Sequence, residues 1–230
     1  MAKLELKFLG DFEVLRNGRP QTLPPSRKTR ALLAFLCLNP RRFRREYLCE
    51  LLWEVPDDPR GSLRWSLSKL RRLVDDKDRP RLIADRTYVE MDTSGASVDA
   101  LAIRSLADRD VKDITLEELE HSAEYLRGDL LEGLDLPNFY DFHGWCVAER
   151  EQVTRAQARL LKELVNRLGD DAERALPHAR ALVSLSPYDE DARALLIRLL
   201  VSLGYLEEAE QQYRMGLRML KEIGVVPQGA

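Results

Sequence analysis

Hydrophobic and charged residues alternate at the start of the chain, which predicts a β-strand. Leu4, Leu6 and Phe8 alternate with charged residues, and a period of two places the two kinds of side chain on opposite faces of a strand. The pattern resumes at Val14 and reaches Asn17-Gly18, a dipeptide typical of two-residue hairpin turns. The sequence therefore opens with a predicted β-hairpin.

Three helical patterns follow this hairpin. Residues 25–39 open with Pro25 and Ser26, a residue type that caps helices, and are apolar nearly all round from Ala31 to Leu38, which predicts a buried helix. Residues 44–54 form a second, amphipathic pattern, and two prolines separate it from a third pattern at 60–76. The third helix has an apolar stripe with spacings of four, three and four, made of Leu63, Leu67, Leu70 and Val74.

Two short β-like runs come next, Leu82–Ala84 and Tyr88–Met91. Three helices followed by a two-stranded hairpin make a winged helix-turn-helix, in which the last helix fits the major groove of DNA. Residues 1–97 are therefore predicted to form an α+β winged helix-turn-helix domain that binds DNA.

Residues 98–230 are predicted to form an all-α, tetratricopeptide-like domain. Helical patterns cover 98–109 and 115–127, and a long helix runs from Trp145 to Leu168. Stacked helix pairs of the tetratricopeptide kind bind other chains on concave surfaces, and an unrelated α-helical bundle is the alternative. Small and aromatic residues recur after the tetratricopeptide period of 34 residues, with Ala175, Ala179 and Leu182 followed by Ala209, Tyr213 and Gly216.

The net charge differs in sign between the same two parts of the chain. The net charge of the 230 residues is −3, but residues 1–97 carry 20 Lys and Arg against 14 Asp and Glu, and residues 98–230 carry 16 against 25. The balance is therefore +6 in the first part and −9 in the second. This asymmetry favours an anion-binding domain joined to a domain that binds something else.

The third predicted helix carries cations and small hydroxyls on the side opposite its leucine stripe. The hydroxyls belong to Ser62, Ser66 and Ser68. Arg can bond guanine through two N–H groups, Ser can reach bases or phosphates, and Lys supplies a point charge. A solvated face is the alternative explanation, but such a face usually mixes positive and negative charges.

Other candidates lie on the same helix, on the hairpin and at the start of the first helix. Trp65 either packs on the wing or the second domain, or contacts a thymine methyl group or a sugar. Arg86 is either a wing contact with DNA or an exposed turn arginine, and Ser26 begins a helix that offers N–H groups and charge to a phosphate. The candidate DNA-binding residues are Arg27, Lys28, Arg60, Arg64, Trp65, Ser68, Lys69, Arg71, Arg72, Arg86 and Thr87.

Other classes of function find little support in the sequence. The three histidines are scattered and no nucleotide-binding or nucleophile motif occurs, so we expect no enzyme, no cofactor and no bound metal. No apolar run reaches the ~18 residues of a membrane span, and no signal-peptide core follows the N-terminus. The number of cysteines is odd, and we interpret Cys37 and Cys49 as reduced core residues, which predicts a cytoplasmic protein without membrane contact.

The order of these motifs resembles that of bacterial antibiotic-regulatory-protein-type activators. The stretches "LKFLGDFEVLRNGRP", "SRKTRALLAFLCLNP" and "YLCELLWEVPDDPRGSLRWSLSKLRRLV" resemble the OmpR-type DNA-binding domain of that family. "LRGDLLEGLDLPNFYDFHGWCVAERE" through "LKEIGVVP" is similar to the bacterial transcriptional activator domain that follows it. The likeness covers residues 3–227, and it places the recognition helix at 60–74 and the wing at 83–90.

The resemblance implies a regulator that binds promoter DNA, often at direct repeats, and recruits RNA polymerase. Larger members carry an ATPase or sensor region after this point, so we expect either a short member or a fragment. The partners implied are double-stranded promoter DNA, RNA polymerase and a second copy on tandem sites. The alternative is a helical-repeat scaffold whose winged helix binds protein, but the basic third helix favours DNA.

Overall fold

The computed structural model describes residues 3–53, 58–76 and 79–222. The chain forms two compact units, Met1–Ser105 with Tyr125–Val153, and Leu106–Glu124 with Thr154–Ala230. Each unit thus combines segments that are distant in the sequence. The domain boundary predicted at residue 97 follows chain order instead, and it stays a prediction.

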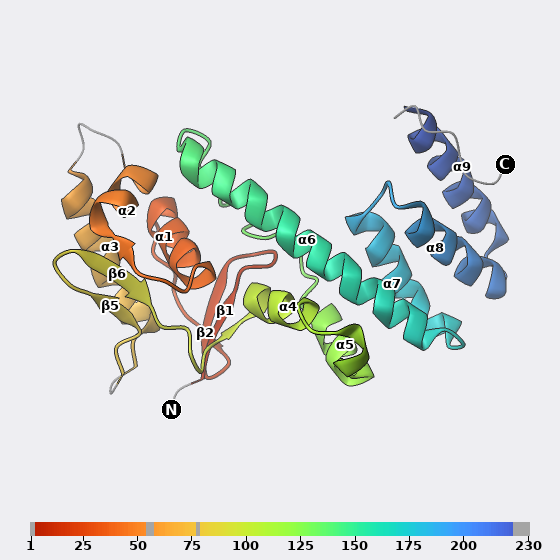
Figure 1. Cartoon of the computed structure of the whole chain (residues 1–230), viewed down its shortest axis with the longest axis horizontal. Helices are drawn as coiled ribbons and strands as arrows, with labels where there is room; N and C mark the ends of the chain where they lie inside the picture. Colours follow the sequence, from red (N-terminus) through yellow and green to blue (C-terminus); the bar gives the residue numbers. More distant parts are fainter. Residues whose placement is uncertain (1–2, 54–57, 77–78, 223–230) are drawn as a thin grey trace. The chain divides into compact units, whose positions relative to one another are not determined.

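A four-stranded sheet opens the first unit (Figure 1), with the strand order β3-β2-β1-β7. β1 (Leu4–Lys7) and β2 (Glu13–Arg16) are antiparallel. The predicted turn at Asn17-Gly18 joins β2 to β3 (Arg19–Pro20), and both turn residues have positive φ, 51° and 73°, as a type I′ turn requires. β7 (Ser97–Val98) adds to β1 in parallel, a pairing that the sequence pattern did not predict.

Three helices and a second small sheet complete the winged helix-turn-helix (Figure 1). α1 (Arg27–Leu38), α2 (Arg45–Leu52) and α3 (Pro59–Val74) match the three predicted helical patterns. The second sheet has the order β4-β6-β5. Its strands are the predicted β5 (Leu82–Ala84) and β6 (Tyr88–Met91), and the unpredicted β4 (Phe43–Arg44).

α1 forms the centre of the first unit, as its apolar sequence predicts. Every residue from Ala31 to Leu38 is buried. α6 (Tyr140–Leu168) begins five residues before its predicted start, and its first turns cover α1. The ring of Trp145 lies 4.9 Å from that of Phe35, and Phe142 is fully buried.

The second unit is helical. α7 (Ala172–Leu185) and α9 (Leu206–Glu222) begin 34 residues apart, which equals the repeat period predicted from the sequence. Ala209 and Gly216 are buried in the packing of α9, whereas Tyr213 is 53% exposed, so the aromatic residue of the repeat lies outside the core. The helices are η1 (Val111–Asp113), α5 (Leu116–Ala123), α7 (Ala172–Leu185), α8 (Glu190–Ser202) and α9 (Leu206–Glu222), with the later part of α6.

α4 (Asp99–Ala107) and α6 contribute residues to both units.

Across the three described ranges, no helix is both long and apolar enough to cross a membrane.

Candidate nucleic-acid interface

The sequence around Asp58 determines where α3 begins. The Asp58 carboxylate accepts a hydrogen bond from the backbone N–H of Gly61 at 2.8 Å, and Pro59 occupies the first turn, where its missing N–H costs nothing. A Cβ on Gly61 would lie 2.2 Å from an Asp58 oxygen, so a larger residue there would displace the capping carboxylate from its present position. The predicted apolar stripe of α3 is buried, and Leu73 is buried beside it. This face of α3 packs on α1, α2 and β5 through Leu63, Leu67, Leu70, Leu73 and Val74.

The opposite face of α3 is exposed and basic. Lys69 is half-buried, and its ammonium lies 5.1 Å from the centre of the Trp65 ring. Trp65 itself is 47% exposed, so it is not buried against the wing and its ring is accessible. The exposed residues of this face are Arg60, Arg64, Trp65, Ser68, Arg71 and Arg72.

Ser66 corrects the sequence interpretation of this helix. The sequence pattern placed its hydroxyl on the solvated side, but Ser66 is buried and its Oγ lies 2.8 Å from the Oγ1 of Thr29. The hydroxyl thus joins α3 to α1. A buried hydroxyl is stable only with a partner, and the partner in α1 could not be found from the pattern of α3 alone.

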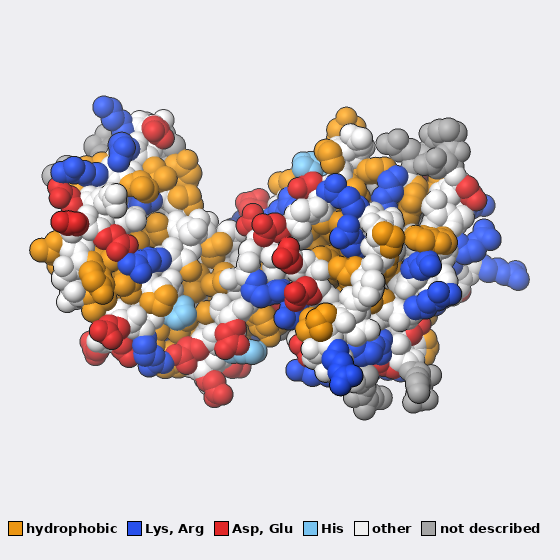
Figure 2. Space-filling model, turned by 180° about the vertical axis from the view of Figure 1, so that it is seen from behind, with side chains coloured by type: hydrophobic (Ala, Val, Ile, Leu, Met, Phe, Trp, Pro, Cys, Tyr) orange, Lys and Arg blue, Asp and Glu red, His pale blue; other side chains and the backbone are white. Residues whose placement is uncertain are grey.

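Few acids oppose the cations of α3. The guanidinium of Arg60 lies 3.8 Å from the carboxylate of Glu46, with both side chains mostly exposed. Within residues 3–53, 58–76 and 79–222, no carboxylate lies within 4 Å of Arg64, Arg71 or Arg72. Figure 2 shows Lys and Arg side chains gathered on the surface of the first unit, at the right of the picture. The face therefore offers uncompensated positive charge to a polyanion.

The wing turn is held by its own aspartate. The Asp85 carboxylate accepts hydrogen bonds from the backbone N–H groups of Tyr88 and Thr87, each at 2.7 Å. These bonds, together with nearby Arg42, lower the pKa of Asp85. Arg86 and Thr87 are both exposed at the tip, so the predicted wing residues lie on a fixed turn.

The side chains of Arg27 and Lys28 contact the segment before α6 and do not extend the exposed face of α3. The Arg27 guanidinium donates to the carbonyl oxygens of Gly133 and Asp135 at 2.9 and 2.8 Å. The ammonium of Lys28 lies 4.3 Å from the centre of the Phe139 ring. Both side chains thus hold the segment before α6, whereas the remaining candidates belong to α3 and the wing.

A basic run outside the predicted DNA-binding residues lies beside the wing. The run consists of Arg41 and Arg42 before β4, Arg44 in β4 and Arg45 at the start of α2, and β4 pairs with β6 of the wing. Four arginines within five residues are a visible sequence signal. What the sequence does not show is their pairing with a strand about 45 residues later.

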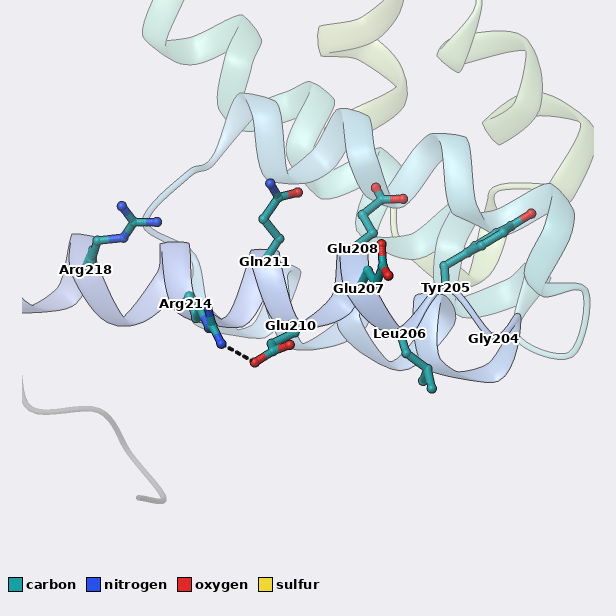
Figure 3. Close-up of a pocket in the computed structure, with 9 residues that line it drawn as sticks. All are labelled: Gly204, Tyr205, Leu206, Glu207, Glu208, Glu210, Gln211, Arg214 and Arg218. Atoms are coloured by element: carbon teal, nitrogen blue, oxygen red, sulfur yellow. Dashed lines mark hydrogen bonds and ion pairs between the residues drawn. The ribbon is translucent and has the colours of Figure 1, made fainter.

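The surface also contains shallow hollows. One lies between the starts of α1 and α3, where Ser26, Trp53, Asp58 and Trp65 are among its lining residues. In the second unit, residues from Gly204 to Arg218 line a hollow along α9 (Figure 3). Its side chains are mixed in charge, with Glu210 and Arg214 paired at 2.5 Å.

The winged helix-turn-helix and the stacked helices define a class of bacterial transcription regulator, and comparison with known families agrees. The family model described as the bacterial transcriptional activator domain matches residues 96–230, more than half of the chain. The chain therefore belongs to the bacterial transcriptional activator domain family, and the resemblance found in the sequence is confirmed.

Comparison with solved structures confirms the fold class. The chain is similar in fold to Mycobacterium tuberculosis EmbR in complex with a low-affinity phosphopeptide, with a TM-score of 0.68 and 21% sequence identity. The match covers 100% of this chain and 63% of that chain, so this chain spans less than two thirds of its length. No curated protein matches the chain.

Proposed function

We propose that this chain is a sequence-specific regulator that binds double-stranded promoter DNA through α3 and activates transcription by recruiting RNA polymerase. The observation that carries the proposal is the exposed face of α3, where Arg64, Arg71 and Arg72 stand free of carboxylates in the described part of the chain. α3 follows two helices and precedes a wing, which is the arrangement that presents a helix to the major groove. We propose no catalytic step and a cytoplasmic location.

The residues on this face divide into two roles. Arg64 and Lys69, next to Trp65 near the middle of the helix, are the candidates for contacts to base edges. Arg71 and Arg72 lie in the last turn of α3, where they also complement the negative end of the helix dipole. We assign these two, with Arg86 of the wing, to backbone phosphates, which set orientation rather than sequence preference.

The second unit supplies the protein-binding part of the proposal. Tyr188, Tyr205, Leu206 and Tyr213 are each more than half exposed, and exposed apolar residues on stacked helices are typical of surfaces that bind other chains. We propose that this unit contacts RNA polymerase and, on tandem sites, a second copy of the chain. A weak contact is enough there, because two bound copies have a high effective concentration.

Selection from a pool of random duplexes with the purified chain tests the proposal, followed by binding of the selected duplex at several salt concentrations. If about five phosphates are neutralised, log K falls against log salt with a slope near −4 to −5. Enrichment of no sequence, with no salt-dependent affinity for any duplex, would reject DNA binding. It would instead favour the alternative, a scaffold whose winged helix binds protein.

A further inference from the structure

The basic run at 41–45 is physically part of the wing. Arg44 is paired with Tyr88 in the β4–β6 ladder. The backbone N–H of Arg45 donates to the carbonyl oxygen of Thr87 at 2.9 Å. The start of α2 is therefore bonded to the turn that carries Arg86.

Two of the four arginines are used to build the turn. Arg42 donates to the carboxylate of Asp85 at 2.9 Å and lies 3.8 Å from that of Glu90. The Nε of Arg45 donates to the carbonyl oxygen of Asp85 at 2.8 Å. These contacts hold the wing and offset the charge of Arg42.

The side chains of Arg41 and Arg44 make no comparable bonds to the wing turn among the described residues. Both are exposed, and among the residues that the structure describes no carboxylate lies within 4 Å of either. Each guanidinium only contacts a ring, that of Phe43 at 4.5 Å for Arg41 and that of Tyr88 at 5.8 Å for Arg44. Two positive charges thus remain unneutralised on the same edge as the wing.

Arg44 also occupies a position where arginine is unfavourable. It is the N-cap of α2 and makes no side-chain capping bond. Ser, Thr, Asp and Asn are preferred at this position because they accept a bond from the first turn, and a cation there opposes the helix dipole. In the same chain, side-chain caps are made by Ser26, Asp58, Thr115, Asp171 and Asp189.

We infer that Arg44, assisted by Arg41, binds backbone phosphates of a DNA duplex beside the wing. The inference rests on the proposed function and extends it, because it adds a line of backbone contacts next to those of α3 and Arg86. Residues that depart from a local preference are concentrated at functional or strained sites. Arg is suited to the role because its fork of N–H groups matches the oxygens of a phosphate.

The substitution Arg44→Ser in the full chain tests this inference, because it has opposite effects on stability and binding. Serine restores an N-cap, so Tm rises, by about 2–4 °C for a chain of this size. Loss of one phosphate contact reduces affinity about 5-fold near 0.15 M salt and makes the salt slope shallower by about 0.9. The loss is the same for the selected duplex and for a scrambled one, as expected of a phosphate contact.

The matched control is Arg198→Gln, which removes one exposed arginine from α8 and changes the net charge equally. It leaves affinity and salt slope unchanged. Adding Arg41→Ala to Arg44→Ser makes the slope shallower by about 1.8 in total.

The outcomes separate this inference from the proposed function. If the unmodified chain binds no duplex, the proposed function falls and the inference falls with it. If the unmodified chain binds and Arg44→Ser keeps its affinity and slope, only the inference is overturned. A lower Tm for Arg44→Ser also overturns it, because Arg44 would then stabilise the wing. A loss restricted to the selected duplex would make Arg44 a base contact and would overturn the phosphate assignment.

Discussion

The hydroxyl oxygens of Thr29 and Ser66 lie 2.8 Å apart, with both side chains buried. This bond joins α1 to α3 and restricts the rotation of α3 about its own axis. Because side chains on one helix face are fixed relative to those on the other, it also determines which residues face the solvent. A buried polar contact in the core thereby orients the cations of the candidate DNA-binding face.

Replacing Ser66 with alanine should destabilise the first unit without removing a DNA contact. The hydroxyl of Thr29 would remain buried without a partner, which costs about 1–3 kcal/mol. Urea unfolding measures this loss, and DNA affinity measured well below Tm should stay within about twofold. The pair Thr29→Val with Ser66→Ala should be closer to neutral, because both polar groups are removed. A large loss of affinity with unchanged stability would instead make Ser66 a DNA contact.

The two faces of α3 should separate binding from stability. Arg64→Ala and Lys69→Ala should each weaken DNA binding while the free energy of unfolding changes by no more than about 0.5 kcal/mol, because both side chains lie on the outer face. Leu67 is buried, so Leu67→Ala should cost about 2–5 kcal/mol. Thermal unfolding and duplex binding on the same preparations test the assignment. Stability losses at Arg64 and Lys69 rather than at Leu67 would show that the faces are reversed.

A buried carboxylate should be a strong determinant of stability in the first unit. Asp99 is 2% exposed and accepts bonds from the backbone N–H groups of Phe8 at 2.9 Å and Leu9 at 3.0 Å, and from Arg127 at 3.1 Å. Asp99→Ala leaves these donors without their acceptor, so we expect a loss of about 3–5 kcal/mol in urea unfolding. Arg127→Ala should cost less, because the backbone donors remain bonded. Equal losses would mean that the ion pair dominates.

Sequence patterns predicted the elements that have a clear period. The leucine stripe of α3, the turn at Asn17-Gly18 and the bounds of β5 and β6 could all be predicted, because each depends on residues near one another in the chain. β4 and β7 have two residues each and form only through distant partners. No period can show such a pairing.

The sequence predicted part of the candidate DNA-binding site, as it predicted part of the fold. The cations of α3 and the wing tip are placed where the sequence pattern put them, whereas Ser66 is buried and Arg27 bonds carbonyl groups about 106 residues away. Those two outcomes depend on long-range contacts. The arginines before α2 were visible in the sequence, but their position at the wing became clear only from the strand pairing.

The pairing of Glu118 with Arg109 predicts a pH dependence in the second unit. The Arg109 guanidinium at 2.6 Å and the backbone N–H of Thr115 at 2.8 Å lower the pKa of Glu118 to about 2. A carboxyl group with a lowered pKa stabilises the folded state above its ordinary pKa, near 4.3. This contribution should therefore be present at pH 7 and disappear as the pH falls from about 5 to 2.

The substitution Glu118→Gln measures that contribution. Urea unfolding should show the variant less stable than the unmodified chain at pH 7, with the difference shrinking as the pH approaches 2. Glu117→Gln is the control, because Glu117 lies in the same first turn and its exposed carboxylate has no ion pair among the described residues. A difference for Glu118→Gln that does not change with pH would contradict the assignment.

Cutting the chain after residue 97 should produce an unstable fragment, although that boundary follows the sequence pattern. Residues beyond 97 complete the first unit, since Val98 pairs with β1 and Phe142 is buried in a segment that belongs to this unit. The fragment 1–97 also lacks the carboxylate of Asp99 and the ring of Trp145, which contacts Phe35 in α1.

We therefore expect the fragment 1–97 to unfold at a lower temperature than the full chain and to bind a half-site only when cooled below its own Tm. The fragment 1–153, which retains every segment of the first unit, should recover most of the stability and the binding to a single half-site. It should still lose cooperativity on a tandem site and fail to stimulate transcription by purified RNA polymerase, because the stacked helices α7 to α9 are missing. Full activation by 1–153 would show that these helices do not have the role proposed for them.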